Sequence, residues 1–151
     1  LAWLARSASF IAISAASLAA VKASAASTRS VMSVMDPAII DVIDELKVFV
    51  PPARIANKPT YSAFESPEFC AIIDELECST VICTGVETDV CVLGTVMTAM
   101  DRGYRTIVVS DACHGSNPES HAATLAHTYR RFEDQIEIGT TDEVLAQWGA
   151  A

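Results

Sequence analysis

The sequence predicts an α/β protein in which parallel strands alternate with helices, and three features of its 151 residues support this. From residue 36 onwards, β-rich runs alternate with amphipathic helical segments, which is the order of βαβ units on a parallel sheet. Hydrophobic residues make up 51% of the chain and charged residues 19%, so the composition is that of a globular domain with a core. No run of strongly apolar residues is long enough to predict a membrane span, and we expect no membrane partner.

Four segments are candidate strands. The strongest are residues 80–85, which stop at Gly85, and residues 105–109. Residues 54–57 and 135–138 are shorter candidates. Because helices separate these segments along the chain, we expect all four to be parallel strands of one sheet with helices on both faces.

The predicted helices begin at capping residues and end near glycine, proline or the last residue of an apolar stripe. Thr88 or Asp89 is expected to cap the third helix, and Thr140 or Thr141 the last. In chain order the helices begin at Asp36-Pro37, Ser66-Pro67, Thr88-Asp89, Pro118 and Thr140. The first is ended by Pro51-Pro52, the third runs through Asp101 or Arg102 and is closed by Gly103, and the others extend to Leu76, Arg130 and Trp148.

Residues 1–35 differ in composition from the rest of the chain. They are mostly Ala and Ser and contain three basic residues but no acid, the first carboxylate being Asp36. A secretory signal, an organellar transit peptide and translated non-coding sequence are three interpretations of this segment. We therefore treat residues 36–151 as the domain. We expect the domain to be cytoplasmic, or exported or organellar if residues 1–30 are a genuine targeting segment.

The charge and the cysteines exclude several functions. The net charge is −9, and nucleic-acid binding needs a basic face, so we expect no nucleic-acid partner. Five cysteines fit neither a disulfide framework nor a zinc motif, which favours thiols in a reducing compartment. His121 and His127 lie off a shared helical face and are poor metal ligands. No metal site is expected.

Cys91 has the position of a nucleophile. It lies in the first turn of the predicted helix that follows the strand 80–85. A helix N-terminus carries roughly half a positive charge, which favours a thiolate, and open α/β sheets place active sites at the carboxyl ends of their strands. From these residues alone, a buried cysteine that packs as a small apolar side chain is equally consistent.

Several segments together resemble one enzyme family. The run TGVETDVCVLGT around Cys91 resembles the nucleophile motif of the isochorismatase-like cysteine hydrolases, which include nicotinamidases and carbamoylsarcosine-type amidases. NKPTYSAF at 57–64 resembles the segment that presents the family's catalytic lysine, here Lys58. DRGYRTIVVSDAC at 101–113 resembles the next strand and its active-site loop. With the ending QIEIGTTDEVLAQW, the resemblance covers residues 36–148 in the right order.

The resemblance implies a fold and a reaction. The fold is a three-layer αβα arrangement with a Rossmann-like parallel sheet. The reaction is hydrolysis of a C–N bond of a small amide or carbamoyl compound, without a cofactor, in which Cys91 attacks the carbon and Lys58 stabilises charge near the thiolate. Tyr61 and Phe64 are candidates for an apolar wall of the substrate pocket, and packing in the core is the alternative for both.

The resemblance also implies an unusual backbone next to the nucleophile. The family has a cis peptide bond just before the nucleophile helix, which corresponds here to Val86–Glu87. The backbone N–H groups of Glu87 or Thr88 and of Cys91 are then candidates for an oxyanion hole. One such donor is typically worth about 3 kcal/mol in the barrier.

One part of the family pattern has no counterpart in these residues. The family's catalytic aspartate ends the first strand in a D-x-Q-like motif, whereas the first acid here is Asp36. We therefore expect a domain without the family's first strands, and a chain that is inactive or severely impaired as written. The alternatives to an active amidase are a truncated, inactive member and a relative that only binds small ligands, with a homo-oligomer left open.

Overall fold

The computed structural model describes residues 47, 49–58 and 60–148. The predictions for residues 1–35, and for nearly all of the helix beginning at Asp36, lie outside the described residues. In chain order the described elements are η3 (Ala63–Glu65), α4 (Pro67–Glu75), β1 (Thr80–Val86), η4 (Thr88–Val92), α5 (Leu93–Asp101), β2 (Arg105–His114), α6 (Pro118–Ala123), η5 (Thr124–Thr128), η6 (Tyr129–Phe132), β3 (Ile136–Gly139) and α7 (Thr141–Trp148).

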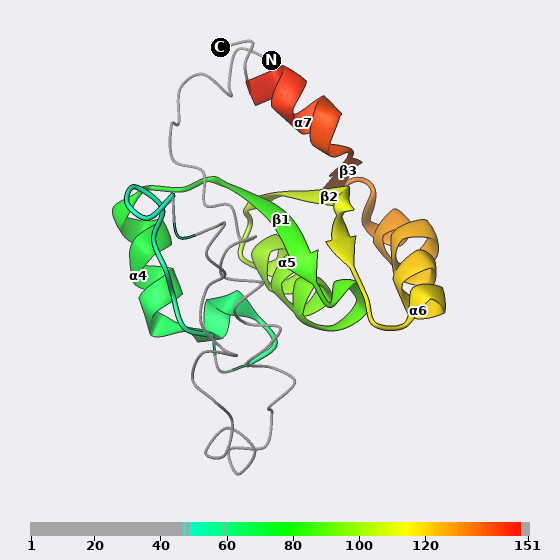
Figure 1. Cartoon of the computed structure of the whole chain (residues 1–151), viewed down its shortest axis with the longest axis horizontal. Helices are drawn as coiled ribbons and strands as arrows, with labels where there is room; N and C mark the ends of the chain where they lie inside the picture. Colours follow the sequence, from blue (N-terminus) through cyan, green and yellow to red (C-terminus); the bar gives the residue numbers. More distant parts are fainter. Residues whose placement is uncertain (1–46, 48, 59, 149–151) are drawn as a thin grey trace.

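The three described strands form one parallel sheet in the order β1-β2-β3 (Figure 1). Thr80 of β1 pairs with Arg105 of β2, and Thr106 of β2 pairs with Ile136 of β3. Each strand therefore lies beside the next one along the chain, with a helical connection between them. This arrangement confirms the parallel pairing predicted for residues 80–85, 105–109 and 135–138.

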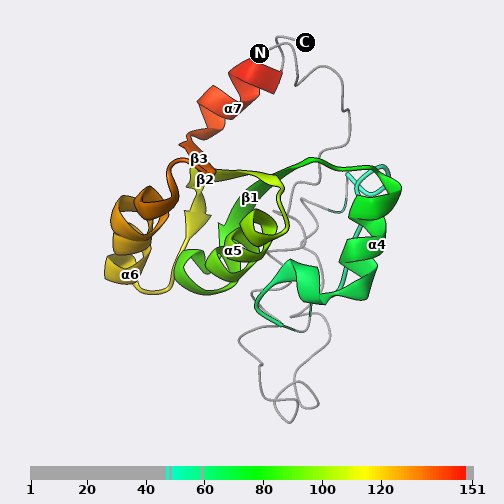
Figure 2. The same ribbon diagram turned by 180° about the vertical axis from the view of Figure 1, so that it is seen from behind.

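Helices cover both faces of this sheet, as predicted. Side chains alternate between the faces of a strand, so Val81 of β1 joins the main core with Val96 of α5. Ile82 and Ile107 point to the other face, where they pack with Val144 of α7. The two ribbon views show α5 against one face of the strands and α7 near the other (Figures 1 and 2).

Residues 54–57 do not form a strand, so that prediction is wrong. The backbone N–H of Asn57 donates to a carboxylate oxygen of Glu68 at 3.0 Å. The carbonyl of Asn57 accepts a hydrogen bond of 2.7 Å from the Ser66 hydroxyl. Because side chains at the start of α4 satisfy both backbone groups, the segment is an irregular connection fastened to that helix.

Two of the predicted helix starts have the expected caps. The Ser66 hydroxyl accepts a hydrogen bond from the backbone N–H of Phe69, and Pro67 is the first helical residue of α4. At α7, the Thr140 hydroxyl accepts from the N–H of Glu143 at 3.3 Å, while the Glu143 carboxylate accepts from the N–H of Thr140 at 2.7 Å. This reciprocal pair is a capping box.

The third helix begins differently from the prediction. Its N-cap is Glu87, and no side chain caps the first turn. The Thr88 hydroxyl instead bonds the ring of His121, and Asp89 Oδ1 has no hydrogen-bond partner within the described part of the chain. A π-turn over Thr88–Val92 precedes the α-helical residues. The expected cap is therefore absent, because Thr88 and Asp89 lie inside the turn, after the N-cap position.

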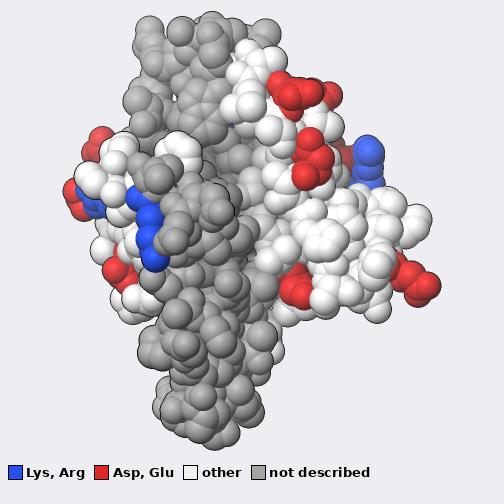
Figure 3. Space-filling view, viewed as in Figure 1, with Lys and Arg blue, Asp and Glu red and all other residues white. Residues whose placement is uncertain are grey.

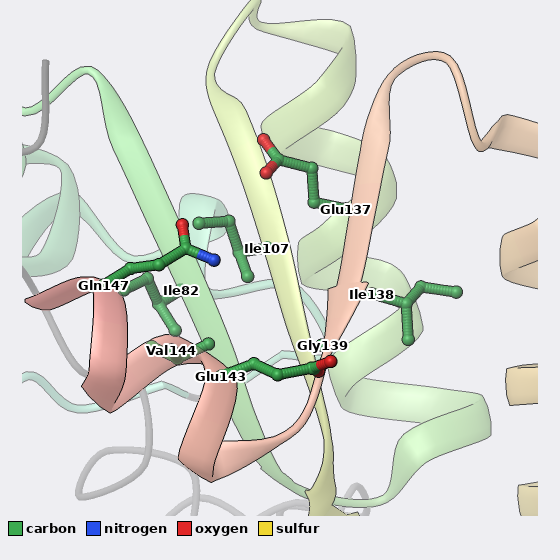
Figure 4. Close-up of a pocket in the computed structure, with 8 residues that line it drawn as sticks. All are labelled: Ile82, Ile107, Glu137, Ile138, Gly139, Glu143, Val144 and Gln147. Carbon is green, nitrogen blue, oxygen red and sulfur yellow. The ribbon is translucent and has the colours of Figure 1, made fainter. Parts of the chain in front are cut away.

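The last helix and the sheet line a small open pocket. Its volume is about 220 Å³, and Figure 4 shows Ile82 and Ile107 projecting from the strands toward Val144 of α7. The remaining lining residues are Glu137, Ile138, Gly139, Glu143 and Gln147. On the face shown in Figure 3, acidic side chains gather over α7, whose first turn contains Asp142 and Glu143.

Candidate active site

Lys58 and Cys91 are distant in the sequence, and the structure brings their side chains together in a buried setting. Lys58 is 8% exposed and Cys91 is 4% exposed. Burial lowers the pKa of the Lys58 ammonium, while attraction to Cys91 and a hydrogen bond with its side chain oppose that effect. The same ammonium donates hydrogen bonds to the carbonyls of Thr60 and of Tyr61, the latter at 2.9 Å.

Cys91 is placed by a sharp change of direction at the end of β1. Gly85 has a φ of 110°, a conformation that residues with a Cβ rarely adopt, and the Val86–Glu87 peptide bond is cis. The chain then enters the π-turn that contains Cys91. The Glu87 carbonyl accepts hydrogen bonds from the N–H groups of Val90 at 3.2 Å and Val92 at 3.0 Å. The nucleophile candidate is thus held at the carboxyl end of the strand.

The turn before Cys91 is also fastened from outside by the segment that follows β2. The Ser116 backbone N–H and hydroxyl donate to the Glu87 carboxylate at 3.1 and 2.9 Å. The hydroxyl of Thr88 shares a hydrogen bond of 2.8 Å with Nδ1 of His121. The hydroxyl of Tyr129 donates to the Thr88 carbonyl at 3.1 Å. Sequence reasoning missed these three partners; the one available signal was that residues 118–130 belong to the family-like stretch.

The two aromatic candidates for a pocket wall lie in different environments. Phe64 is 3% exposed, and its ring lies 5.2 Å from Phe69 and 5.4 Å from Tyr104 between centroids. This is the core packing that we weighed against a wall. Tyr61 is 52% exposed and lies on Gly94 of α5, where an added Cβ would stand 3.6 Å from the Tyr61 Cβ.

Replacing Phe64 by alanine is expected to lower the free energy of unfolding by about 3–5 kcal/mol, because the change leaves a cavity in the core. The matched change Tyr61→Ala is expected to cost less than about 1 kcal/mol, because half of that side chain is already in water. Urea unfolding followed by circular dichroism measures both values. Equal losses for the two variants would contradict the core assignment of Phe64.

Three of the other cysteines, Cys78, Cys83 and Cys113, lie in settings that disfavour a thiolate. Burial raises the pKa of Cys83, and it raises the pKa of Cys113 to about 11. Burial also raises the pKa of Cys78.

Among the described residues there is no group of three or more His, Cys, Asp or Glu side chains placed to hold a metal ion. The described part of the chain also contains no helix long and apolar enough to span a membrane.

Comparison with curated proteins finds similar hydrolases. The chain is 33% identical over 92 residues to "Ureidoacrylate amidohydrolase RutB" of Methylobacterium radiotolerans, covering 60% of this chain and 36% of that protein. It is 33% identical over 86 residues to "Nicotinamidase 3" of Arabidopsis thaliana, covering 56% of this chain and 43% of the relative. The chain thus spans less than half the length of these two relatives.

Solved structures are similar as well. An isochorismatase-like hydrolase from Alkaliphilus metalliredigens superposes with a TM-score of 0.56 and 27% identity, over 64% of this chain and 51% of that one. A nicotinamidase from Staphylococcus aureus gives a TM-score of 0.53 and 26% identity, over 64% and 58%. The family model for the isochorismatase domain matches residues 19–140, a range that begins inside the segment of unusual composition. The chain therefore belongs to the isochorismatase family.

Proposed function

We propose that this chain is a cysteine hydrolase that cleaves the C–N bond of a small amide or carbamoyl compound, with Cys91 as the nucleophile. The observation that carries the proposal is the buried contact between the Cys91 side chain and the Lys58 ammonium at the end of β1. The names of the relatives, an amidohydrolase and a nicotinamidase, favour amide substrates. The carboxyl edge of a parallel sheet is also where such sites are built.

In the proposed reaction, the Cys91 thiolate attacks the carbonyl carbon of the amide, and a C–S bond forms. The C–N bond then breaks as the leaving nitrogen takes a proton, and water hydrolyses the resulting thioester to free the acid. The Lys58 ammonium stabilises the negative charge of the attacking sulfur. That attraction is stronger in a buried site than in water, because the effective dielectric constant is lower.

The tetrahedral intermediate of this attack carries a negative oxygen, which needs hydrogen-bond donors. Backbone N–H groups of Glu87 or Thr88 and of Cys91, around the cis peptide bond, are the donors that we propose. Loss of one oxyanion donor in an acyl-transfer enzyme typically costs about 3 kcal/mol. Tyr61, which is half exposed beside Lys58, is the residue that we propose for a wall of the substrate pocket.

The direct test is the mass of the intact protein after incubation with a panel of small amides and with an activated ester. We expect an increase equal to one acyl group, located on Cys91 by peptide mapping. An adduct on another cysteine, or none on Cys91 with any acyl donor, would contradict the proposal.

Replacing Lys58 by methionine is expected to slow the alkylation of Cys91 by iodoacetamide about tenfold or more, because an opposite charge within a few ångströms favours the thiolate. The variant also leaves the carbonyls of Thr60 and Tyr61 without their donor, at a cost in stability of about 1–3 kcal/mol. Circular dichroism therefore accompanies the kinetics. Lys47→Met, at an exposed lysine, is the matched control, and an equal rate in both variants would remove Lys58 from the mechanism.

A further inference from the structure

The helical segment after β2 holds the residue that follows the cis peptide bond by both its side chain and its backbone. Thr88 is 0% exposed. Its hydroxyl bonds Nδ1 of His121 at 2.8 Å, and its carbonyl accepts from the Tyr129 hydroxyl at 3.1 Å. His121 lies on α6 and Tyr129 begins η6, so two different turns of that segment bind one residue of the turn.

We propose that His121 is a positioning residue for the acylation step, acting through the Thr88 hydroxyl to hold the turn from Glu87 to Cys91 in the orientation that aims its backbone N–H groups at the oxyanion. This inference rests on the proposed function of Cys91. His121 acts through Thr88, because its Nδ1 shares a hydrogen bond with the hydroxyl of that fully buried side chain. Tyr129 supports the same residue from its carbonyl side.

Residues from three segments lie close to His121. A Cβ added at Gly115 would stand 3.2 Å from the Cβ of His121 and 3.5 Å from Oδ1 of Asp89. The ring of His114 lies 5.9 Å from that of His121 between centroids. Because these residues come from the end of β2, from the loop after it and from the π-turn, the imidazole sits where the three segments meet.

Two reactions of Cys91 separate this role from a general effect on the fold. Acetyl transfer from p-nitrophenyl acetate forms a C–S bond and releases p-nitrophenolate through a tetrahedral oxyanion. Alkylation by iodoacetamide forms a C–S bond and releases iodide by direct displacement, with no oxyanion. Peptide mapping follows both products at Cys91 in the full 151-residue chain.

The variants change the hydrogen bond between Thr88 and His121 while keeping side chains of similar size. His121→Leu and Thr88→Val each remove it, and His121→Asn keeps a hydrogen-bonding atom close to the position of Nδ1. The exposed His127, on the same helical segment, supplies the control His127→Ala. We expect His121→Leu and Thr88→Val to acetylate about 10- to 100-fold more slowly, with alkylation changed less than twofold. His121→Asn recovers most of the lost rate, and the double variant is no slower than either single one.

Other results overturn the inference. If acetylation and alkylation slow by the same factor, the Thr88–His121 hydrogen bond affects the fold or the thiol and not the oxyanion donors. If acetylation is unchanged in His121→Leu, His121 has no role in positioning the turn. If the unaltered chain forms no acetyl adduct while Cys91 still alkylates, the proposed function itself fails and this inference falls with it. The proposed function also fails if the Cys91→Ala chain is acetylated as fast as the unaltered chain.

Discussion

Replacing Cys91 by alanine is expected to lower the rate of acyl-adduct formation from an activated ester by a factor on the order of 10³ or more. The two immediate neighbours of the nucleophile, Val90 and Val92, carry only hydrocarbon side chains, so neither can replace it. Removing the nucleophile of a covalent catalyst leaves only the contribution of binding and of oxyanion donors. Intact-mass spectrometry after incubation with an activated ester measures the loss.

The control for this experiment is a second cysteine in the same domain. Cys70 lies on α4 and its thiol donates to the carbonyl of Phe64, away from the π-turn. Cys70→Ala is therefore expected to retain the rate of the unaltered chain. Full activity in Cys91→Ala, or a similar loss in both variants, would contradict the assignment of Cys91.

The second large effect concerns the group that takes the proton of the thiol. These 151 residues contain no carboxylate before Asp36 that matches the aspartate of the family motif. A version carrying a family-type strand with that aspartate ahead of the domain is expected to turn over small amides about 10²–10⁴-fold faster than the 151-residue chain, because a positioned base contributes that much.

The comparison needs both proteins and the Cys91→Ala form of each. Equal turnover by the two parent proteins, with both alanine forms inactive, would show that another group accepts the proton. A gain only in the version with the aspartate would identify the carboxylate as the base. The same strand with asparagine in place of the aspartate separates the chemical role of the carboxylate from the effect of a longer sheet.

Much of the sheet is predictable from the sequence because the relevant signals are local. Residues 80–85 and 105–109 are runs of β-branched residues bounded by turn residues, and both became strands. Ser66-Pro67 likewise carries its own cap and first turn. The segment 54–57 has no such pattern, and its conformation depends on Glu68 and Ser66, which reach back to Asn57. A tertiary hydrogen bond of this kind leaves no mark in the segment itself.

The candidate site divides in the same way. The family resemblance covers the motifs of both Lys58 and Cys91, so it placed the two residues in one site. In the structure their side chains interact. The anchors of Thr88 come from residues 33 and 41 positions further along the chain. No period or spacing connects such partners, because the contact depends on how the segment after β2 folds back over the end of β1.

The shift of register between β1 and β2 has a consequence for how the domain can change in length. Cys83 pairs with Val108, but Gly85 pairs with Cys113. Four residues of β2 therefore lie opposite one residue of β1 between these two pairs. Those four include Ser110, whose hydroxyl bonds the Gly139 carbonyl, and Asp111, whose carboxylate accepts from the N–H of Thr141. The extra residues of β2 therefore connect the sheet to the end of β3 and the start of α7. An insertion or deletion between Val108 and Cys113 would shift His114 relative to its partner Val86. The number of residues here is therefore constrained by the strand pairing on both sides of the irregularity.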